Sequence, residues 1–284
     1  MEVKDIKMVA IAGAGTMGIG IAQLSVIAGH NTLLFDINKD ALEKAKKALD
    51  KNLNKAIEKG KLSESEKNKA WERVCFINNP EELKGDIIIE AVVERLDVKQ
   101  RLFQKAIDLN GENTILATNT SSIPITRIAA GLSKPENVVG MHFFNPAHIM
   151  KLVEVISGAA TRPEIANLVF DLAESWGKTA VMAKDRPGFI VNRVARHFYV
   201  ESLKVLEEQV ATHEQIDMLM ESSGFKMGPF RLMDLIGVDT NFSVTSSMFE
   251  SFHYDSKFRP SIIQQQKVEA GHHGRKNGKG FYDY

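Results

Sequence analysis

Short apolar runs alternate with helix-like segments through the first two thirds of the chain, and this alternation limits the possible folds most strongly. The runs cover Met8 to Ala12, Thr32 to Phe35, Asp86 to Ala91, Thr114 to Ala117, Val138 to Met141, Leu152 to Ile156 and Thr179 to Met182. A run that is apolar throughout predicts a strand buried on both faces, and strands separated by helices pair in parallel. We therefore predict an α/β fold with a mostly parallel sheet between layers of helices.

The pattern changes after the turn-forming residues Lys184 to Gly188. Only helical segments follow, at Phe189 to Glu207, His213 to Ser222, Pro229 to Leu235, Asn241 to Phe252 and Pro260 to Ala270. The length of 284 residues suits two domains. We predict an α/β domain over residues 1–184 and an all-α domain over 185–284.

Composition excludes several classes of protein. Lys and Arg together number 36, as do Asp and Glu, so the chain has no excess of positive charge that would indicate nucleic-acid binding. No apolar run reaches the roughly 20 residues of a membrane span, and the start of the chain lacks a signal peptide. Cys75 is the single cysteine, which suits a reducing compartment. We expect a cytoplasmic protein, although removal of an organelle-targeting segment would leave the same sequence.

A glycine motif follows the first predicted strand. Gly13-Ala14-Gly15-Thr16-Met17-Gly18 matches GxGxxG and opens a helix, the context in which this motif binds a dinucleotide pyrophosphate. Asp36 ends the second strand about 20 residues on, where a carboxylate accepts hydrogen bonds from the adenosine ribose. This pattern predicts a Rossmann-type domain that binds NAD rather than NADP, with Lys39 as the one contrary signal. The alternative is a structural turn with Asp36 capping the next helix.

Two titratable residues interrupt apolar runs. His142 ends the run that begins at Val138, and Glu154 lies inside the run Leu152 to Ile156. Buried titratable groups are costly unless they satisfy each other or take part in chemistry. A carboxylate on one imidazole nitrogen sets the tautomer of the ring and leaves the other nitrogen for proton transfer. Taken alone, the two residues would more often form a satisfied core pair than a catalytic pair.

Six sequence blocks resemble one enzyme family from end to end. They are GAGTMGIGIAQ, EAVVERLDVKQ, ATNTSSIPIT, GMHFFNPAHIMKLVEV, PGFIVNR and GRKNGKGFYDY. The chain is similar to short-chain L-3-hydroxyacyl-CoA dehydrogenases, most of all to bacterial 3-hydroxybutyryl-CoA dehydrogenases. The resemblance implies NAD-dependent interconversion of a 3-hydroxyacyl-CoA and a 3-oxoacyl-CoA. It also implies that His142 is the acid/base and that Glu154 is its partner.

The resemblance also assigns residues that bind substrate and cofactor. Ser121 and Asn192, the latter on the first helix of the second domain, would hold the substrate oxygen, and Ser121 would also lie near the nicotinamide. The other implied cofactor residues are Gly13, Gly15, Thr16, Met17, Gly18, Asp36, Glu94, Lys99, Asn145 and Lys276. For CoA the implied residues are Lys59 and Asn52, again with Ser121. From the residues alone, Ser121 also fits a helix cap, and Glu94 with Lys99 an exposed charge pair.

The sequence departs from the family pattern in three places. His148 replaces part of an apolar, proline-containing tripeptide, Arg231 replaces an expected Glu, and His272-His273 replaces a more apolar pair. Adjacent histidines without a third ligand are a weak metal signal, so we predict no metal site. An acyl-CoA substrate and a homodimer or higher homo-oligomer are expected. The alternatives are a sugar-acid dehydrogenase and an NAD-binding structural or redox-sensing protein on the same fold.

Overall fold

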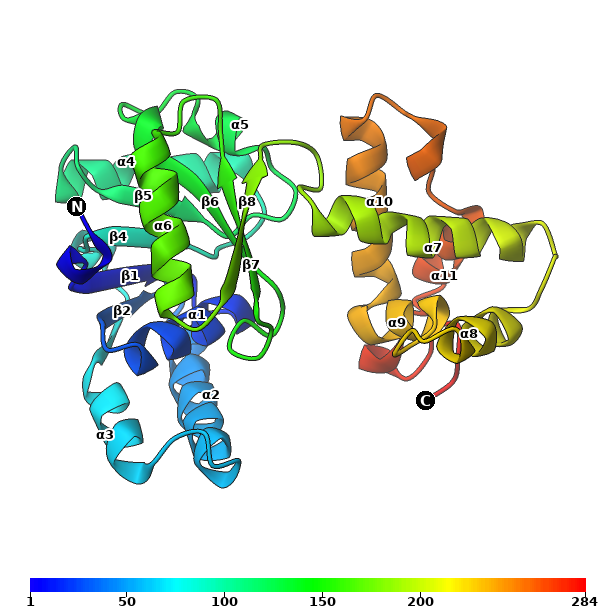
Figure 1. Cartoon of the computed structure of the whole chain (residues 1–284), viewed down its shortest axis with the longest axis horizontal. Coiled ribbons are helices and arrows are strands. Elements are labelled where there is room, and N and C mark those ends of the chain that lie inside the picture. Colours follow the sequence, from blue (N-terminus) through cyan, green and yellow to red (C-terminus); the bar gives the residue numbers. More distant parts are fainter. The chain divides into compact units, whose positions relative to one another are not determined.

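The computed structural model describes residues 1–284, which form two compact units, Met1–Arg186 and Pro187–Tyr284. Figure 1 shows a layered α/β architecture in unit 1 and helices alone in unit 2. The helices of unit 1 are α1 (Thr16–Ile27), α2 (Lys39–Glu58), α3 (Glu64–Glu72), α4 (Leu96–Asn110), α5 (Ile125–Ala129) and α6 (Pro163–Ser175). Its strands are β1 (Met8–Ala12), β2 (Asn31–Phe35), β3 (Val74–Ile77), β4 (Ile87–Glu90), β5 (Ile115–Thr118), β6 (Val138–Phe143), β7 (Leu152–Ser157) and β8 (Thr179–Lys184).

The strands of unit 1 make one sheet in the order β3-β2-β1-β4-β5-β6-β7-β8. All neighbours pair in parallel except β6 and β7, which are antiparallel. The segment 144–151 that joins these two strands is shorter than the dozen or more residues that a parallel crossover needs. The predicted mostly parallel sheet is confirmed, with this one reversal.

The sequence patterns missed α3 and β3. Glu64–Glu72 is largely charged and buries only Ala70, so it has no apolar stripe to reveal a helix. Ser63 nevertheless caps α3, because its side chain accepts a hydrogen bond from the Glu66 amide. The strand β3 is short, and it pairs with β2 at one edge of the sheet.

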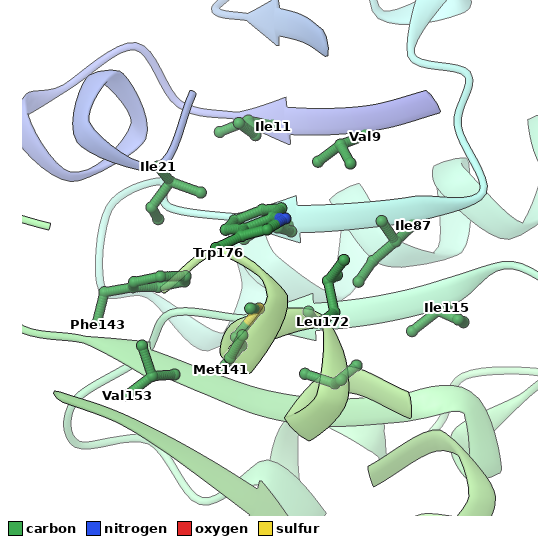
Figure 2. Packing of buried hydrophobic residues seen from close by; sticks show 14 of the residues in the cluster. Val9, Ile11, Ile21, Ile87, Ile115, Met141, Phe143, Val153, Leu172 and Trp176 are labelled. Carbon is green, nitrogen blue, oxygen red and sulfur yellow. The ribbon is translucent and has the colours of Figure 1, made fainter. Parts of the chain in front are cut away.

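The core of unit 1 lies between the sheet and its helices. Every residue of β4, β5 and β6 is buried, so both faces of the central sheet are covered. Figure 2 shows Leu172 of α6 and the neighbouring Trp176 among Val9, Ile87 and Ile115 of the strands. Burying a side chain of this size contributes about 1.5–3 kcal/mol, so this cluster is a main source of stability for unit 1.

The long helix α2 covers its neighbours with one face. Its buried residues, Leu42, Ala45, Leu49 and Leu53, recur every three or four positions, as expected for a half-exposed helix. Asn38 caps its first turn, because the side-chain oxygen accepts hydrogen bonds from the Asp40 and Ala41 amides.

Unit 2 consists of α7 (Val191–Glu207), α8 (His213–Ser222), α9 (Pro229–Ile236), α10 (Val238–Ser251) and α11 (Ile262–Glu269). Phe230, Met233 and Phe281 lie in its core. Asp234 has no exposed surface, and its two oxygens accept hydrogen bonds from the Phe281 and Tyr282 amides. This carboxylate therefore fastens the C-terminal segment to α9. No helix in either unit has the length and apolar character needed to cross a membrane.

Candidate active site

The turn between β1 and α1 has the geometry of a dinucleotide-binding loop. Gly13 has a φ of 110°, a left-handed conformation that favours glycine. A methyl group on Gly18 would lie 1.8 Å from the Gly13 carbonyl oxygen, so this contact requires glycine. A methyl group on Gly15 would meet nothing within 4 Å, which leaves open space in front of the helix N-terminus. The residues at this turn fit a bound pyrophosphate.

Asp36 connects the end of β2 to this turn. Its Oδ2 accepts a hydrogen bond of 2.8 Å from the Ala14 amide, and its Oδ1 accepts one of 2.9 Å from the Asn38 amide. The alternative of Asp36 as the cap of the next helix is wrong, because Asn38 caps α2. A carboxylate has about four acceptor positions, so Asp36 retains capacity for the two ribose hydroxyls.

His142 and Glu154 lie opposite each other in the antiparallel pair β6 and β7. The imidazole Nδ1 is 2.7 Å from Glu154 Oε2, and the residues are 5% and 1% exposed. The reversal of β7 produces this contact, since residues directly opposite in an antiparallel pair place their side chains on the same face. The Phe144 ring packs 4.6 Å from the imidazole, measured between ring centroids. With Nδ1 engaged by the carboxylate, proton transfer by such a ring would use the other nitrogen, Nε2.

Ser121 lies in the segment that follows β5. Its amide donates a 3.1 Å hydrogen bond to Glu94 Oε1, an oxygen that also accepts hydrogen bonds from the amide and hydroxyl of Ser122. The helix-cap alternative for Ser121 is wrong, because α5 begins after Pro124 without a side-chain cap. Glu94 therefore holds the backbone that carries the Ser121 hydroxyl.

Lys99 is buried on the first turn of α4. Its ammonium lies 2.6 Å from Glu90 Oε1 and 3.0 Å from Glu94 Oε2, and its side chain is 1% exposed. The alternative of an exposed charge pair is therefore wrong. Burial acts to raise the pKa of Glu94, but Lys99 and the Thr120 hydroxyl outweigh it and hold this pKa below its ordinary value. The predicted contact of Lys99 with the cofactor stays a prediction.

The carboxyl ends of the parallel strands bring several predicted residues to one edge of the sheet. The Gly13 turn follows β1, Asp36 follows β2, Glu94 follows β4, Ser121 follows β5 and His142 is near the end of β6. Ligands of open α/β sheets bind at this edge. The shared position supports one site in unit 1.

The other predicted residues occupy more exposed places. In unit 1, Thr16 and Met17 begin α1, Asn145 is exposed after β6, Asn52 is half-buried on α2, and Lys59 is exposed at the end of α2. In unit 2, Asn192 lies in the first turn of α7, and the Lys276 ammonium bonds both oxygens of Asp239.

The structure shows the surroundings of two of the residues that depart from the family pattern, His148 and Arg231. His148 is half-buried, and burial, with Lys178, Lys55 and Lys59, lowers the pKa of its imidazole. Arg231 pairs with Glu221 at 3.2 Å. No group of three or more His, Cys, Asp or Glu side chains is arranged to bind a metal ion.

Two buried charges escaped the sequence patterns. Glu90, at the end of β4, has no exposed surface, and its pKa is raised by burial while Lys99 opposes that rise. Lys178 donates hydrogen bonds to the carbonyls of Ala147 and Met150, which lie in the segment after His142, and burial lowers its pKa to about 8. Glu90 could have been found as an acid inside an apolar run, because the same feature identified Glu154 as a candidate.

Both units match family models along nearly their whole length. Residues 8–186 match the model described as 3-hydroxyacyl-CoA dehydrogenase, NAD binding domain, and residues 188–284 match the one described as 3-hydroxyacyl-CoA dehydrogenase, C-terminal domain. The chain belongs to the 3-hydroxyacyl-CoA dehydrogenase family. The predicted family, the α/β fold followed by a helical domain, and NAD as the cofactor of an oxidoreductase are confirmed.

Individual relatives agree with the family models. The chain is 44% identical to a probable 3-hydroxybutyryl-CoA dehydrogenase of Bacillus subtilis, over 99% of this chain and 98% of that protein. It is 46% identical to a 3-hydroxyadipyl-CoA dehydrogenase of Escherichia coli, but it spans only 59% of the length of that protein. The crystal structure of an (S)-3-hydroxybutyryl-CoA dehydrogenase from Ralstonia eutropha matches with a TM-score of 0.94 and 40% identity, over 98% of this chain and 99% of that one.

Proposed function

We propose that this enzyme interconverts (S)-3-hydroxybutyryl-CoA and acetoacetyl-CoA, with NAD as the redox partner. The observation that carries the proposal is the buried pair of His142 and Glu154 at 2.7 Å, at the end of the sheet where ligands bind. The pair can supply the general base that alcohol oxidation needs, because a proton must leave the hydroxyl group as the hydride departs. The relatives named for this substrate add support.

In the oxidation direction, His142 Nε2 accepts the hydroxyl proton of the substrate. Glu154 holds Nδ1 in its protonated form and stabilises the imidazolium as it forms. NAD, when bound, supplies the hydride acceptor. In the reverse direction the imidazolium returns its proton to the oxygen of the reduced product.

Ser121 is proposed to donate a hydrogen bond to the substrate oxygen, where negative charge develops during reduction. Asn192 of unit 2 belongs to the same proposed catalytic set. Asp36 and the Gly13 to Gly18 turn are proposed to bind the adenosine and pyrophosphate of NAD. Glu94, Lys99, Asn145 and Lys276 remain proposed cofactor residues.

For the CoA moiety we propose Lys59 and Asn52 of α2, because phosphate groups need cations and hydrogen-bond donors. Lys59 is exposed at the end of α2. We also propose residues 1–184 as the cofactor domain and residues 185–284 as a substrate and dimerisation domain. A homodimer or higher oligomer and a cytoplasmic location are part of the same proposal, the latter supported by the single cysteine, Cys75.

The test is the rate of NADH consumption with acetoacetyl-CoA, run beside free acetoacetate and beside NADPH. We expect turnover with the thioester and NADH, and little with either substitute. The six-carbon substrate 3-oxoadipyl-CoA is a further arm, because one relative is named for the corresponding hydroxyacyl-CoA. NADH binding without turnover of either thioester would overturn the proposal in favour of an NAD-binding protein without this activity.

A further inference from the structure

Glu90 is a buried carboxylate at the end of β4 with an unusually full set of partners. Its Oε1 accepts a hydrogen bond of 2.8 Å from the Val92 amide, and its Oε2 accepts one of 2.7 Å from the Thr118 hydroxyl. The Lys99 ammonium donates to both oxygens, at 2.6 and 2.8 Å. Neither Glu90 nor the Lys99 side chain has more than 1% of its surface exposed. Nothing in the proposed reaction uses Glu90 directly.

Lys99 links this buried carboxylate to a second one. Its ammonium also lies 3.0 Å from Glu94 Oε2, and the Glu94 side chain is 37% exposed. Two carboxyl groups thus share one ammonium group. A buried ion pair of this kind contributes little to stability compared with apolar packing. We therefore examine which groups its geometry holds in place.

Glu94 in turn holds the backbone that carries Ser121. Its Oε1 accepts hydrogen bonds from the Ser121 amide at 3.1 Å and from the amide and hydroxyl of Ser122 at 3.1 and 2.9 Å. The Thr120 hydroxyl donates to the same oxygen. The orientation of the segment 120–122 therefore depends on where this one oxygen lies.

A second connection runs from Glu90 to the same segment. The Thr118 hydroxyl that donates to Glu90 accepts a hydrogen bond of 3.3 Å from the Thr120 amide. One route passes through Lys99 and Glu94, and the other passes through Thr118. Both routes begin at Glu90 and end on the residue that precedes Ser121.

We propose that Glu90 is a positioning residue for the reaction. Through Lys99 and Glu94 it sets the place of the Ser121 hydroxyl at the carboxyl end of β5. The inference rests on the proposed function, in which this hydroxyl meets the substrate oxygen. Glu90 itself touches neither substrate nor cofactor, because it has no exposed surface.

The test is a double-mutant cycle between Glu90→Gln and Ser121→Ala. Glutamine keeps the size of Glu90, but its NH2 group replaces one of the two oxygens to which Lys99 donates, so in either orientation this group faces the Lys99 ammonium. We expect kcat for acetoacetyl-CoA reduction to fall roughly 10- to 100-fold, since displacing a catalytic group by about 1 Å lowers the rate by up to about this factor. Because Lys99 and Glu94 are themselves proposed cofactor residues, the dissociation constant of NADH is measured for each variant and kcat is compared at saturating NADH.

The cycle separates positioning from general damage. If Glu90 acts through Ser121, Glu90→Gln should lower kcat by less than about threefold in the Ser121→Ala background. Equal loss in both backgrounds would overturn the proposal. The matched control is Glu81→Gln. It removes a carboxylate from an exposed ion pair with Lys105, which lies on α4 like Lys99, and it should leave kcat unchanged.

Amide hydrogen exchange gives a readout that does not depend on activity. Glu90→Gln should speed exchange at the Ser121 and Ser122 amides at least tenfold, with unchanged exchange in β7, and unchanged exchange at both amides would contradict the inference. An inactive wild type would refute the proposed function, whereas an active wild type with an additive cycle would refute the positioning role alone. If Glu90→Gln does not fold, Glu90→Asp takes its place, because shortening the side chain moves the carboxylate away from Lys99 while keeping the charge.

Discussion

Two glycines of the dinucleotide turn should respond to the same substitution in opposite ways. In Gly18→Ala, the new methyl carbon would lie 1.8 Å from the Gly13 carbonyl oxygen, well inside the separation at which such atoms touch. Gly13 has little room to retreat, because a methyl group on it would lie 2.4 Å from the Ala91 carbonyl oxygen. In Gly15→Ala, the methyl group meets no protein atom within 4 Å, and the φ of −78° suits alanine.

These contacts set the expected magnitudes. Overpacking a rigid site costs typically 1–3 kcal/mol, and backbone in the contact places Gly18→Ala at the upper end of that range. For a unit of this size, the midpoint of thermal unfolding should fall by roughly 5 to 10 °C. Gly15→Ala should keep its midpoint or gain slightly, because alanine lowers the entropy of the unfolded chain. Its methyl group instead occupies the space proposed for pyrophosphate, so the dissociation constant of NADH should rise at least tenfold.

The assay is thermal unfolding of each variant together with NADH fluorescence titration. Gly15→Ala is the decisive variant, since it separates binding from folding. Wild-type NADH affinity in a normally folded Gly15→Ala protein would refute the placement of the pyrophosphate at this turn. A normal unfolding midpoint for Gly18→Ala would refute the steric argument.

Three further predictions concern other parts of the chain. Glu154→Gln should lower the rate of acetoacetyl-CoA reduction by roughly 10²–10⁴-fold near pH 7 with unchanged NADH affinity, because an amide no longer fixes the His142 tautomer; a rate within threefold of wild type in stopped-flow assays contradicts this. Burial lowers the pKa of Lys178 from 10.5 to about 8, so the unfolded chain binds more protons between these values and the free energy of unfolding should rise with pH there. Urea unfolding at pH 8 and 10 should show about 1–2 kcal/mol of this rise in wild type and not in Lys178→Met. Gly280→Ala would place a methyl carbon 2.1 Å from Asp234 Oδ1, and should lower the stability of unit 2 by roughly 2–4 kcal/mol in urea unfolding; an unchanged transition would count against the anchoring role of Asp234.

Local patterns in the sequence were sufficient to predict most of the strands of unit 1 and its glycine turn. Apolar runs are strong signals because strands buried on both faces leave no polar positions, and the glycine spacing has a steric origin that the Gly13 and Gly18 contacts make explicit. His142 and Glu154 stood out for the same reason, as titratable groups in otherwise apolar strands. Their mutual contact followed from the reversal of β7, which the short segment 144–151 implies.

Other features depend on contacts that no local pattern encodes. The role of Lys99 in bridging Glu90 and Glu94 arises where a strand end, a loop and a helix meet, so no local sequence pattern predicts its burial. Asp36 and Asn38 are both good helix caps by residue type, and only the backbone decides between them. α3 was missed because a helix with a single buried residue has no apolar period.

The central claim is that His142 transfers the proton that accompanies hydride transfer. The most direct measurement is the single-turnover rate at which bound NADH reduces saturating acetoacetyl-CoA in wild type and in His142→Gln, with NADH affinity determined for both. The account predicts a rate lower by roughly 10²–10⁴-fold in the variant, with NADH affinity within about twofold of wild type. A variant that binds NADH normally and reduces the thioester at the wild-type rate would contradict it.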